Sequence, residues 1–311
     1  MNLFCSPVKK LFLPCIPFYN IYRFTCMKNL CFLAVIIFCS CQSPANTEIT
    51  EKTTGNDTLS SKEVSVNKTD SIVKTNTISL PGIEVPVLCY HQIREWKGNE
   101  SRLAKDVIVP PARFKAQMQI LADSGYQTVL PDQLYDYLTK GASLPPKPVM
   151  ITFDDGVVDQ YTIGAPELKK HGFKGVFFIM TISLGRSIYM SREQVKSLAE
   201  DGHAVETHTW SHQNLKKYKP EDWDEQIVKS CNQLQEITGQ QAKYLAYPFG
   251  VWTQEGIPEL KKRNIKAAFQ LSTKIDENNP LYTIRRMIVP GDWSPESMIR
   301  AMKKTFKTQT E

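Results

Sequence analysis

Two adjacent carboxylates, Asp154 and Asp155, end the apolar, β-branched run at residues 149–156. Such a run is typical of a buried parallel strand, and the active sites of α/β proteins lie at the carboxyl ends of such strands. Because neighbouring aspartates repel each other, a bound cation is the usual reason to keep both, one as a ligand and one as a base. An Asp-Gly turn after a strand is the simpler alternative. The stretch alone favours neither interpretation.

A histidine pair later in the sequence favours the metal site over the simple turn. His208 and His212 stand four residues apart, which places both imidazoles on one face if the segment is a helical turn. Two histidines and one carboxylate with an open coordination position are a typical ligand set for a catalytic metal ion. Either histidine alone is more simply explained as a structural residue. Together with the adjacent carboxylates, the pair predicts a metal site.

These motifs resemble those of a known family, the polysaccharide deacetylases, also described as NodB-homology or carbohydrate esterase family 4 domains. The matching segments are Thr-Phe-Asp-Asp-Gly at 152–156, His-Thr-Trp-Ser-His at 208–212 and Tyr-Pro-Phe-Gly at 247–250. They occur in the family's order, and the resemblance extends from residue 85 to the C-terminus. It implies an α/β fold, an irregular (β/α) barrel of about seven parallel strands. It also implies metal-dependent hydrolysis of N-acetyl groups of a polysaccharide, with release of acetate.

The resemblance gives roles to the first two motifs. It implies that Asp155, His208 and His212 bind a divalent metal, Zn²⁺ or alternatively Co²⁺ or Ni²⁺. The ion would lower the pKa of its bound water towards about 7 and polarise the acetyl carbonyl. Asp154 would then be the general base that takes the proton of this water.

The third motif and a later tryptophan are expected to meet the substrate. The resemblance implies that the backbone N–H of Phe249 stabilises the oxyanion together with the metal. Tyr247 of the same turn would bind substrate. Asp292-Trp293 resembles the family's Asp-Trp motif, which implies that Trp293 lines the substrate groove; a surface pair without a function is the alternative.

Two positions depart from the common family pattern. No histidine follows His212, although the common pattern has its general acid there. One branch of the family, which deacetylates poly-N-acetylglucosamine, looks circularly permuted and carries the acid on its first strand; Val-Leu-Cys-Tyr-His at 87–91 matches it. We therefore assign His91 as the acid, although a lone histidine at a strand end is more often structural. Ala246 occupies the position of the arginine that normally orients the base, for which Arg285 or Arg286 is a candidate replacement.

Strands and helices alternate along the matching region, which predicts a parallel α/β domain. Periodicity alone does not separate a barrel from an open sheet, so the barrel rests on the resemblance. The predicted strands are 86–91, 127–130, 149–153, 175–180, 203–207, 243–247, 267–271 and 283–289. The predicted helices are 114–124, 131–140, 161–171, 191–201, 220–238, 258–262 and 295–306. Ser191 and Gln194 predict a capping box at the start of one of them.

The N-terminal part is predicted to direct the protein to the envelope. Met27-Lys28-Asn29 and the apolar residues 30–38 are typical of a signal, and Cys41 after Ser40 resembles the lipidated residue of bacterial lipoproteins. We predict a lipid on Cys41 that anchors the protein to the inner or outer membrane, facing the periplasm or the surface. An ordinary signal peptide is the alternative. Residues 1–40 are thus a leader, 41–80 a flexible tether and 81–311 the deacetylase domain.

Composition limits the other functions. The formal charge of +6 comes mostly from four basic residues in the first 40, so nothing favours nucleic-acid binding. Six of the eight cysteines also precede residue 42, and the remaining Cys89 and Cys231 do not predict a disulfide framework. The expected partners are an N-acetylated polysaccharide and, through the lipid, a membrane. We expect a monomer.

Other functions remain open within these limits. The substrate could be peptidoglycan, chitin oligomers or an O-acetylated glycan instead of a poly-N-acetylglucosamine-like polymer. A non-catalytic carbohydrate-binding lipoprotein is a second possibility, which the intact Asp154 and the intact ligand set argue against. Structural zinc or metal buffering is a third, but three ligands with an open position favour catalysis.

Overall fold

The computed structural model describes residues 84–272 and 274–306. The chain divides into two units, Met1–Asp70 and Ser71–Glu311, and every described residue belongs to the second. The predicted leader at 1–40, the predicted lipid site at Cys41 and the predicted tether at 41–80 lie outside the described residues. Among the residues described, no helix is both long enough and apolar enough to cross a membrane.

Short parallel strands form the centre of the domain. Eight of them follow the order β10-β9-β8-β7-β6-β5-β1-β11, and β4 pairs with β5 beside this path. The strands are β1 (Val87–Tyr90), β4 (Gln127–Thr128), β5 (Pro148–Phe153), β6 (Val176–Ile179), β7 (Ala204–Thr207), β8 (Tyr244–Ala246), β9 (Ala267–Gln270), β10 (Ile284–Arg285) and β11 (Met287–Ile288). A small second sheet pairs β2 (Gln92–Ile93) with β3 (Ile108–Val109).

The main sheet is nearly closed because its two ends are consecutive in the chain. β10 pairs with β9 at one end and β11 pairs with β1 at the other, with Arg286 as the single residue between them. The single strand predicted at 283–289 is therefore two strands that join opposite ends of the sheet. The predicted fold class, an irregular parallel (β/α) barrel, is confirmed, with nine short strands where about seven were expected.

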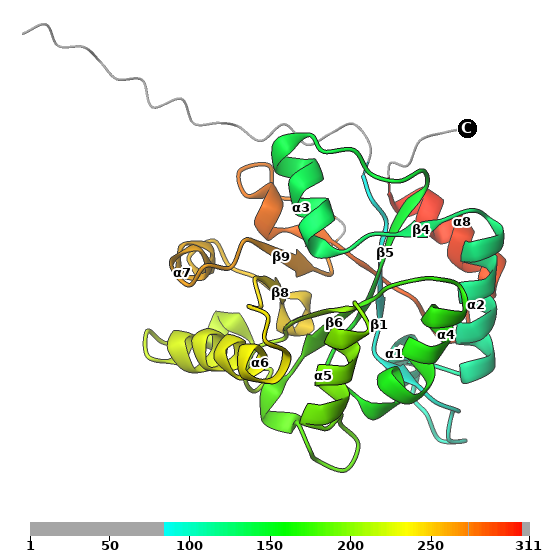
Figure 1. The fold of residues 1–311 in the computed structure, drawn as a ribbon, viewed down its shortest axis with the longest axis horizontal. Coiled ribbons are helices and arrows are strands. Elements are labelled where there is room, and N and C mark those ends of the chain that lie inside the picture. Colours follow the sequence, from blue (N-terminus) through cyan, green and yellow to red (C-terminus); the bar gives the residue numbers. More distant parts are fainter. Residues whose placement is uncertain (1–83, 273, 307–311) are drawn as a thin grey trace, which may run out of the picture. The chain divides into compact units, whose positions relative to one another are not determined.

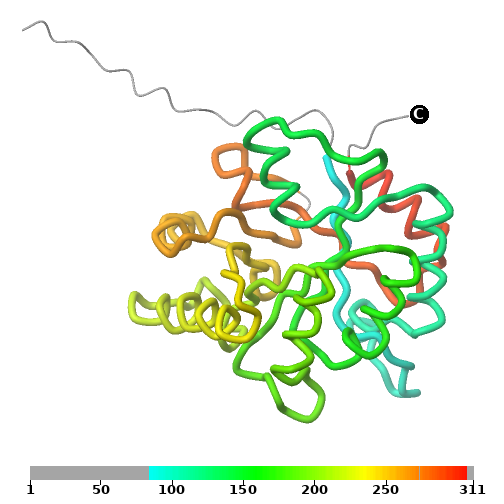
Figure 2. Tube along the Cα trace, viewed as in Figure 1, coloured from blue at the N-terminus to red at the C-terminus, as the bar shows by residue number. Residues whose placement is uncertain are grey.

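Helices surround the strands. Figures 1 and 2 show α2 and α8 side by side on one flank, and α6 and α7 on the opposite flank. The predicted capping box is confirmed, because Ser191 and Gln194 exchange hydrogen bonds of 2.9 and 3.2 Å. The helices are α1 (Arg102–Val107), α2 (Pro111–Asp123), α3 (Pro131–Lys140), α4 (Ala165–Lys170), α5 (Arg192–Glu200), α6 (Ser230–Thr238), α7 (Gly256–Lys262) and α8 (Pro295–Thr305).

Two of the predicted helices begin as π-helical turns. Residues 160–164 precede α4, and residues 224–229 precede α6, where the sequence predicted continuous helices at 161–171 and 220–238. Each π-helical segment has i→i+5 hydrogen bonds. This geometry is rare in proteins, and where it occurs it often lies at a functional site. Each contributes one fully buried glutamine, Gln160 or Gln226, to the candidate functional site.

The strands separate two apolar clusters. Leu88 and Tyr90 of β1 belong to one cluster, whereas Val87 belongs to the other, together with Phe178 and Phe269. This alternation follows from the strand geometry, in which successive side chains point to opposite faces. The side chains that follow Val87 in steps of two therefore share its face of the sheet, which becomes important for the residues at the end of β1.

Glu206 supports the sheet where β7 and β8 pair only at Thr207 and Leu245. Its Oε2 accepts hydrogen bonds from the backbone N–H groups of Lys243 and Tyr244, at 2.7 and 2.9 Å. The carboxyl is buried, and burial raises the pKa of Glu206 to about 8, against the opposing effect of the two N–H groups.

We expect the free energy of unfolding of the wild-type protein to fall as the pH rises, and we expect Glu206→Gln to lack this fall. Because the folded pKa of about 8 exceeds the unfolded value, the carboxyl stabilises the fold fully at low pH, and this contribution is lost as pH rises through about 8. The shift corresponds to about 5 kcal/mol in the free energy of unfolding. Urea unfolding between about pH 5 and 9 measures it. Glu236→Gln is the control because that side chain is 70% exposed; equal pH slopes in both variants would contradict the expectation.

Candidate functional site

The predicted site residues meet at the carboxyl ends of three strands. His91 follows β1, Asp154 and Asp155 follow β5, and His208 follows β7, with His212 in the next loop. In a parallel sheet these ends lie along one edge, so residues distant in sequence become neighbours.

Asp155, His208 and His212 form a cluster that can hold a cation. Oδ1 of Asp155 lies 3.6 Å from Nε2 of His208 and 3.6 Å from Nε2 of His212, and the three ligand atoms lie within 4.8 Å of one another. These separations exceed hydrogen-bond lengths but are close to the edge of about 3.4 Å expected between nitrogen and oxygen ligands around one Zn²⁺ ion. The donor set and its spacing therefore fit a divalent metal.

The segment that carries the two histidines is not a helical turn, the condition under which their spacing would place both imidazoles on one face. Residues 208–212 form an irregular loop after β7, in which Thr209 and His212 have φ angles of 68° and 58°. The imidazoles of His208 and His212 nevertheless lie with their ring centroids 4.7 Å apart. Their approach therefore comes from the way the loop is held, and not from a helical repeat.

Gln226 holds this loop from the π-helical segment before α6. The backbone carbonyl of Gln226 accepts a hydrogen bond of 2.9 Å from the backbone N–H of Trp210. In its side chain, Oε1 accepts a hydrogen bond of 3.1 Å from the backbone N–H of Ser211, and Nε2 donates one of 2.8 Å to the Ser211 hydroxyl. Nothing in the sequence near residues 208–212 points to this glutamine, because the contact is made across a separation of 15 residues.

Left-handed backbone is concentrated at the site. Asp155, Thr209, His212 and Phe249 have φ between 58° and 74°, and they are four of the six non-glycine residues with positive φ in the described part of the chain. Such conformations cost non-glycine residues about 1–3 kcal/mol each and persist only when the surroundings impose them. The surrounding structure therefore holds the loops that carry the metal-ligand candidates in backbone conformations that are locally unfavourable.

The orientation of His208 follows from a backbone carbonyl. Its Nδ1 lies 2.8 Å from the oxygen of Ala246, which can only accept a hydrogen bond. Nδ1 therefore carries the proton, and Nε2 presents its lone pair to a cation, as metal-bound histidines in proteins usually do. Ala246 is also the position where the resemblance predicted an arginine, and here its carbonyl orients a ligand candidate instead.

Arg286, and not Arg285, pairs with Asp154. The guanidinium donates from Nη1 to Oδ1 at 2.6 Å and from Nη2 to Oδ2 at 2.7 Å, and both side chains are buried. Burial alone would raise the pKa of Asp154, but Arg286, assisted by His208 and His91, holds it below its ordinary value. Arg285 pairs instead with Glu84. The carboxylate of Asp154 is thus ionised and fixed in orientation.

His91 lies beside the same carboxylate. Its Nε2 is 3.9 Å from Oδ2 of Asp154, and its side chain is 16% exposed, so one part of the ring reaches solvent. Burial lowers the pKa of His91, and the carboxylates of Asp154 and Asp155 oppose that effect. The side-chain amide of Gln160 donates to the carbonyls of both His91 and Asp154, which ties the ends of β1 and β5 together. No pattern in the sequence points to this role of Gln160.

The remaining predicted residues lie in different environments. Phe249 is 60% exposed, and its ring centroid is 4.5 Å from that of His212. The side chain of Tyr247 is in the core, where its hydroxyl donates to the carbonyl of Tyr282 at 3.0 Å, so the ring offers no surface beside the histidines. Trp293 packs against the core cluster around α2 and α8, and its contact with substrate stays a prediction.

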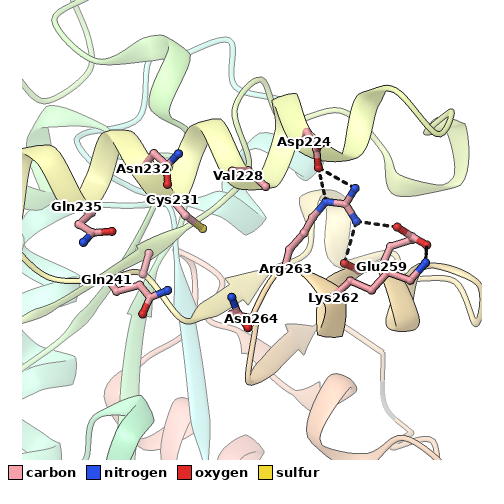
Figure 3. Close-up of a pocket in the computed structure, with 11 residues that line it drawn as sticks. Asp224, Val228, Cys231, Asn232, Gln235, Gln241, Glu259, Lys262, Arg263 and Asn264 are labelled. Carbon is pink, nitrogen blue, oxygen red and sulfur yellow. Dashed lines mark hydrogen bonds and ion pairs between the residues drawn. The ribbon is translucent and has the colours of Figure 1, made fainter. Parts of the chain in front are cut away.

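A separate hollow lies between α6 and α7 (Figure 3). Arg263 spans its rim and donates to Asp224 at 2.8 Å and to Glu259 at 2.6 Å, so its charge is paired within the protein. Cys231 of α6 also lines it, and none of the predicted site residues does. The hollow is therefore separate from the metal-ligand candidates and the Asp154 pair, which match the chemistry predicted from the sequence.

Comparison with known families and proteins agrees with this geometry. The family model described as polysaccharide deacetylase matches residues 141–268. The Bacillus subtilis (strain 168) protein YxkH, itself assigned to the polysaccharide deacetylases, is 34% identical over 179 residues, which cover 58% of this chain and 61% of that protein. The match thus spans about three fifths of that relative's length. A poly-beta-1,6-N-acetyl-D-glucosamine N-deacetylase of Staphylococcus aureus (strain MRSA252) is 25% identical over 228 residues, 66% of this chain and 78% of that one.

Solved structures agree as well. The Streptococcus pyogenes deacetylase PplD, determined in complex with acetate, aligns with a TM-score of 0.65 at 25% identity and covers 71% of this chain and 98% of its own. IcaB from Ammonifex degensii aligns with a TM-score of 0.59 at 26% identity and covers 72% of this chain and 97% of its own.

Proposed function

We propose that this chain, which belongs to the polysaccharide deacetylase family, hydrolyses N-acetyl groups of a poly-N-acetylglucosamine-like polysaccharide with the help of a divalent metal ion. The observation that carries the proposal is the Asp155, His208 and His212 cluster, with the Arg286-bound carboxylate of Asp154 directly beside it. A carboxylate fixed next to a site for a divalent ion is the arrangement that metal-assisted hydrolysis requires.

The choice of polymer rests on the position of His91. The only histidines among the described residues at the carboxyl ends of the strands are His91, His208 and His212, and the latter two belong to the ligand cluster. A histidine at the end of the first strand, as His91 directly after β1, is the arrangement expected for the permuted branch that acts on poly-N-acetylglucosamine. The 25% identity with a protein named as a poly-beta-1,6-N-acetyl-D-glucosamine N-deacetylase supports the same choice.

The metal is proposed to be Zn²⁺, with Co²⁺ and Ni²⁺ as alternatives. Two imidazoles and one carboxylate suit all three ions, and an open coordination position is typical of catalytic zinc sites. Bound there, the ion supplies Lewis-acid chemistry by activating a water molecule and polarising the acetyl carbonyl.

Asp154 is proposed to accept the proton of the attacking water. Its pKa lies below the ordinary value, so the carboxylate is ionised throughout the neutral range and one proton can be received. Arg286 keeps both oxygens in a fixed plane and compensates the charge in a buried setting. Because Asp154 follows the strand that also delivers Asp155, base and ligand are held by one backbone segment.

His91 is proposed to complete the reaction. As the C–N bond of the tetrahedral intermediate breaks, the nitrogen needs a proton to leave as an amine. His91 donates this proton after taking it up from solvent at the exposed part of its ring. The products are acetate and a free amino group on the sugar. The backbone N–H of Phe249 is proposed to donate to the oxyanion, from a turn whose left-handed φ of 61° is fixed next to His212.

We expect Arg286→Lys to lower kcat/KM about 10- to 100-fold, because lysine offers a point charge where the carboxylate now has a bidentate partner. Deacetylation rates of the metal-loaded protein measure the effect. Arg285→Lys is the matched control, since the adjacent arginine pairs with Glu84 and not with Asp154. A rate for Arg286→Lys within about twofold of wild type would exclude an orienting role.

We also propose that the domain is held at the bacterial envelope by a lipid on Cys41. The support is the pattern of Met27-Lys28-Asn29, the apolar residues 30–38 and Ser40 before Cys41. Such an anchor places a polysaccharide-modifying domain near polymers of the envelope. Radiolabelled palmitate incorporation in cells, lost in Cys41→Ala, would test this; equal labelling of both proteins would refute it.

The substrate is tested by measuring free amines. The protein is loaded with Zn²⁺, Co²⁺ or Ni²⁺ in turn and incubated with poly-β-1,6-N-acetylglucosamine oligomers or with chitin oligomers. Metal-dependent amine release from the β-1,6 polymer supports the proposal. Release from chitin oligomers alone would keep the mechanism and change the substrate. No release from either polymer, with one metal ion bound per chain, would point to another acylated glycan or to a carbohydrate-binding protein.

A further inference from the structure

The thiol of Cys89 lies beside Asp154 and His91 and is a soft potential metal ligand. It is fully buried on β1, and its Sγ lies 3.6 Å from Oδ2 of Asp154 and 4.0 Å from Nδ1 of His91. The Nε2 of His91 is 3.9 Å from the same carboxylate oxygen. One ligand atom from each of the three residues lies within 4.8 Å of the other two. Cys89 is a free thiol.

Strand geometry produces this cluster. Cys89 and His91 are two residues apart along β1 and its end, so their side chains project to the same face. In the parallel pairing of β1 with β5, Cys89 lies opposite Thr152, and Asp154 follows two residues later on the same face. The three donors therefore converge because two adjacent strands end in register.

The spacing suits a metal ion. An ion bound at about 2.3 Å from sulfur and about 2.1 Å from oxygen or nitrogen holds sulfur about 3.6 Å from either atom in a tetrahedron. The observed Sγ to Oδ2 distance of 3.6 Å equals that edge, and the Sγ to Nδ1 distance of 4.0 Å exceeds it by a few tenths. A small rotation of the partly exposed His91 ring closes the difference.

We propose that Cys89, His91 and Asp154 form a second, inhibitory site for a thiophilic divalent ion, such as Cd²⁺ or Zn²⁺ in excess. Binding releases the thiol proton of Cys89 to solvent and forms one metal bond each to sulfur, nitrogen and oxygen, without any redox change. The inhibitory consequence rests on the proposed function, because the ion binds the imidazole of His91 and the carboxylate of Asp154, the two groups that the reaction needs.

Two features distinguish the metal preference of this site from that of the Asp155, His208 and His212 cluster. The Asp155, His208 and His212 cluster offers only nitrogen and oxygen, whereas the second offers sulfur, which softer ions prefer. The guanidinium of Arg286, bound to both oxygens of Asp154, repels a cation there. The second site is therefore expected to fill only after the first, and most readily with Cd²⁺.

The test uses the full chain loaded with one equivalent of Zn²⁺ and titrated with Cd²⁺. The six cysteines that precede residue 42 are replaced by serine in every sample, so that their thiols do not bind Cd²⁺. Three readouts are followed: the ultraviolet band of a thiolate–cadmium bond, the bound metal after equilibrium dialysis, and the deacetylation rate relative to the same protein without Cd²⁺. The variant is Cys89→Ser, whose hydroxyl keeps a hydrogen-bond donor near Asp154 but is a hard ligand. Cys231→Ser is the matched control, because it removes the other free thiol of the described residues.

Wild type and Cys231→Ser are expected to bind a second ion, show the band and lose activity. Cys89→Ser is expected to lack the band and to need at least about tenfold more Cd²⁺ for half-inhibition. An unchanged band or equal inhibition in Cys89→Ser would overturn the proposal, since displacement of Zn²⁺ from the first site affects both proteins alike.

A second variant keeps the test independent of folding and of activity. If Cys89→Ser does not fold, His91→Gln is used, and a second ion bound as tightly as in wild type would refute the site. The band and the dialysis need no substrate. A protein that binds the second ion but deacetylates nothing would therefore contradict the proposed function while leaving the second site intact.

Discussion

Asp154→Asn is expected to lower kcat/KM for the N-acetylated polymer by about 10²- to 10⁴-fold, the range usual for loss of a general base. The amide cannot accept the proton of water, and the exchange removes the anion that pairs with Arg286. The metal content is expected to stay at one ion per chain, because Asp155, His208 and His212 are unchanged. Amine release under subsaturating substrate and elemental analysis measure the two quantities.

This expectation needs a stability control. Removing one partner of the buried Arg286 pair leaves an uncompensated charge, which costs about 3–5 kcal/mol in comparable proteins. Thermal unfolding therefore accompanies every rate, and Asp159→Asn is the matched substitution, because this carboxyl lies five residues later in the helical turn before residues 160–164. A folded, metal-loaded Asp154→Asn protein with a rate close to wild type would exclude Asp154 as the base.

His91→Gln is expected to have the second-largest effect, about 10²- to 10³-fold on the polymer, because the departing sugar amine then lacks its proton donor. The effect should depend on the leaving group. With 4-nitrophenyl acetate, whose leaving group departs without a proton, the loss is expected to be at least about tenfold smaller. Asp154→Asn should be impaired on both substrates, since both require an activated water.

The comparison of two substrates distinguishes an acid from a structural residue. A general loss of order around β1 would lower both rates equally and would contradict the assignment of His91. His171→Gln serves as the control, because this histidine lies at the end of α4, 3.3 Å from Glu167, away from the strand ends that carry the ligand candidates.

Local patterns determined much of the protein. α3 has the predicted bounds, Pro131–Lys140, because the chain offers Pro131 at the start and Gly141 in a left-handed cap at the end. The apolar runs became the predicted parallel strands. Residue type and spacing also indicated the adjacent Asp154 and Asp155 and the His208 and His212 pair as a metal site, and the family resemblance then implied that Asp155 is the carboxylate ligand. These inferences succeed because propensity, capping and alternation act over a few residues.

Other features were decided only by tertiary structure. Sequence could not choose between Arg285 and Arg286, because the choice depends on β10 and β11 joining opposite ends of the sheet. That split leaves Arg286 between the two strands and directs it to Asp154, whereas Arg285 reaches Glu84.

The geometry of the histidine loop has the same origin. The spacing of the two histidines would bring their rings together on a helical turn, but hydrogen bonds with Gln226 hold an irregular loop in which His212 is left-handed. The position of Cys89 against Asp154 likewise depends on the register between β1 and β5. A local pattern sets which face a side chain occupies, but its neighbours on that face are set by strand pairing and packing between distant segments.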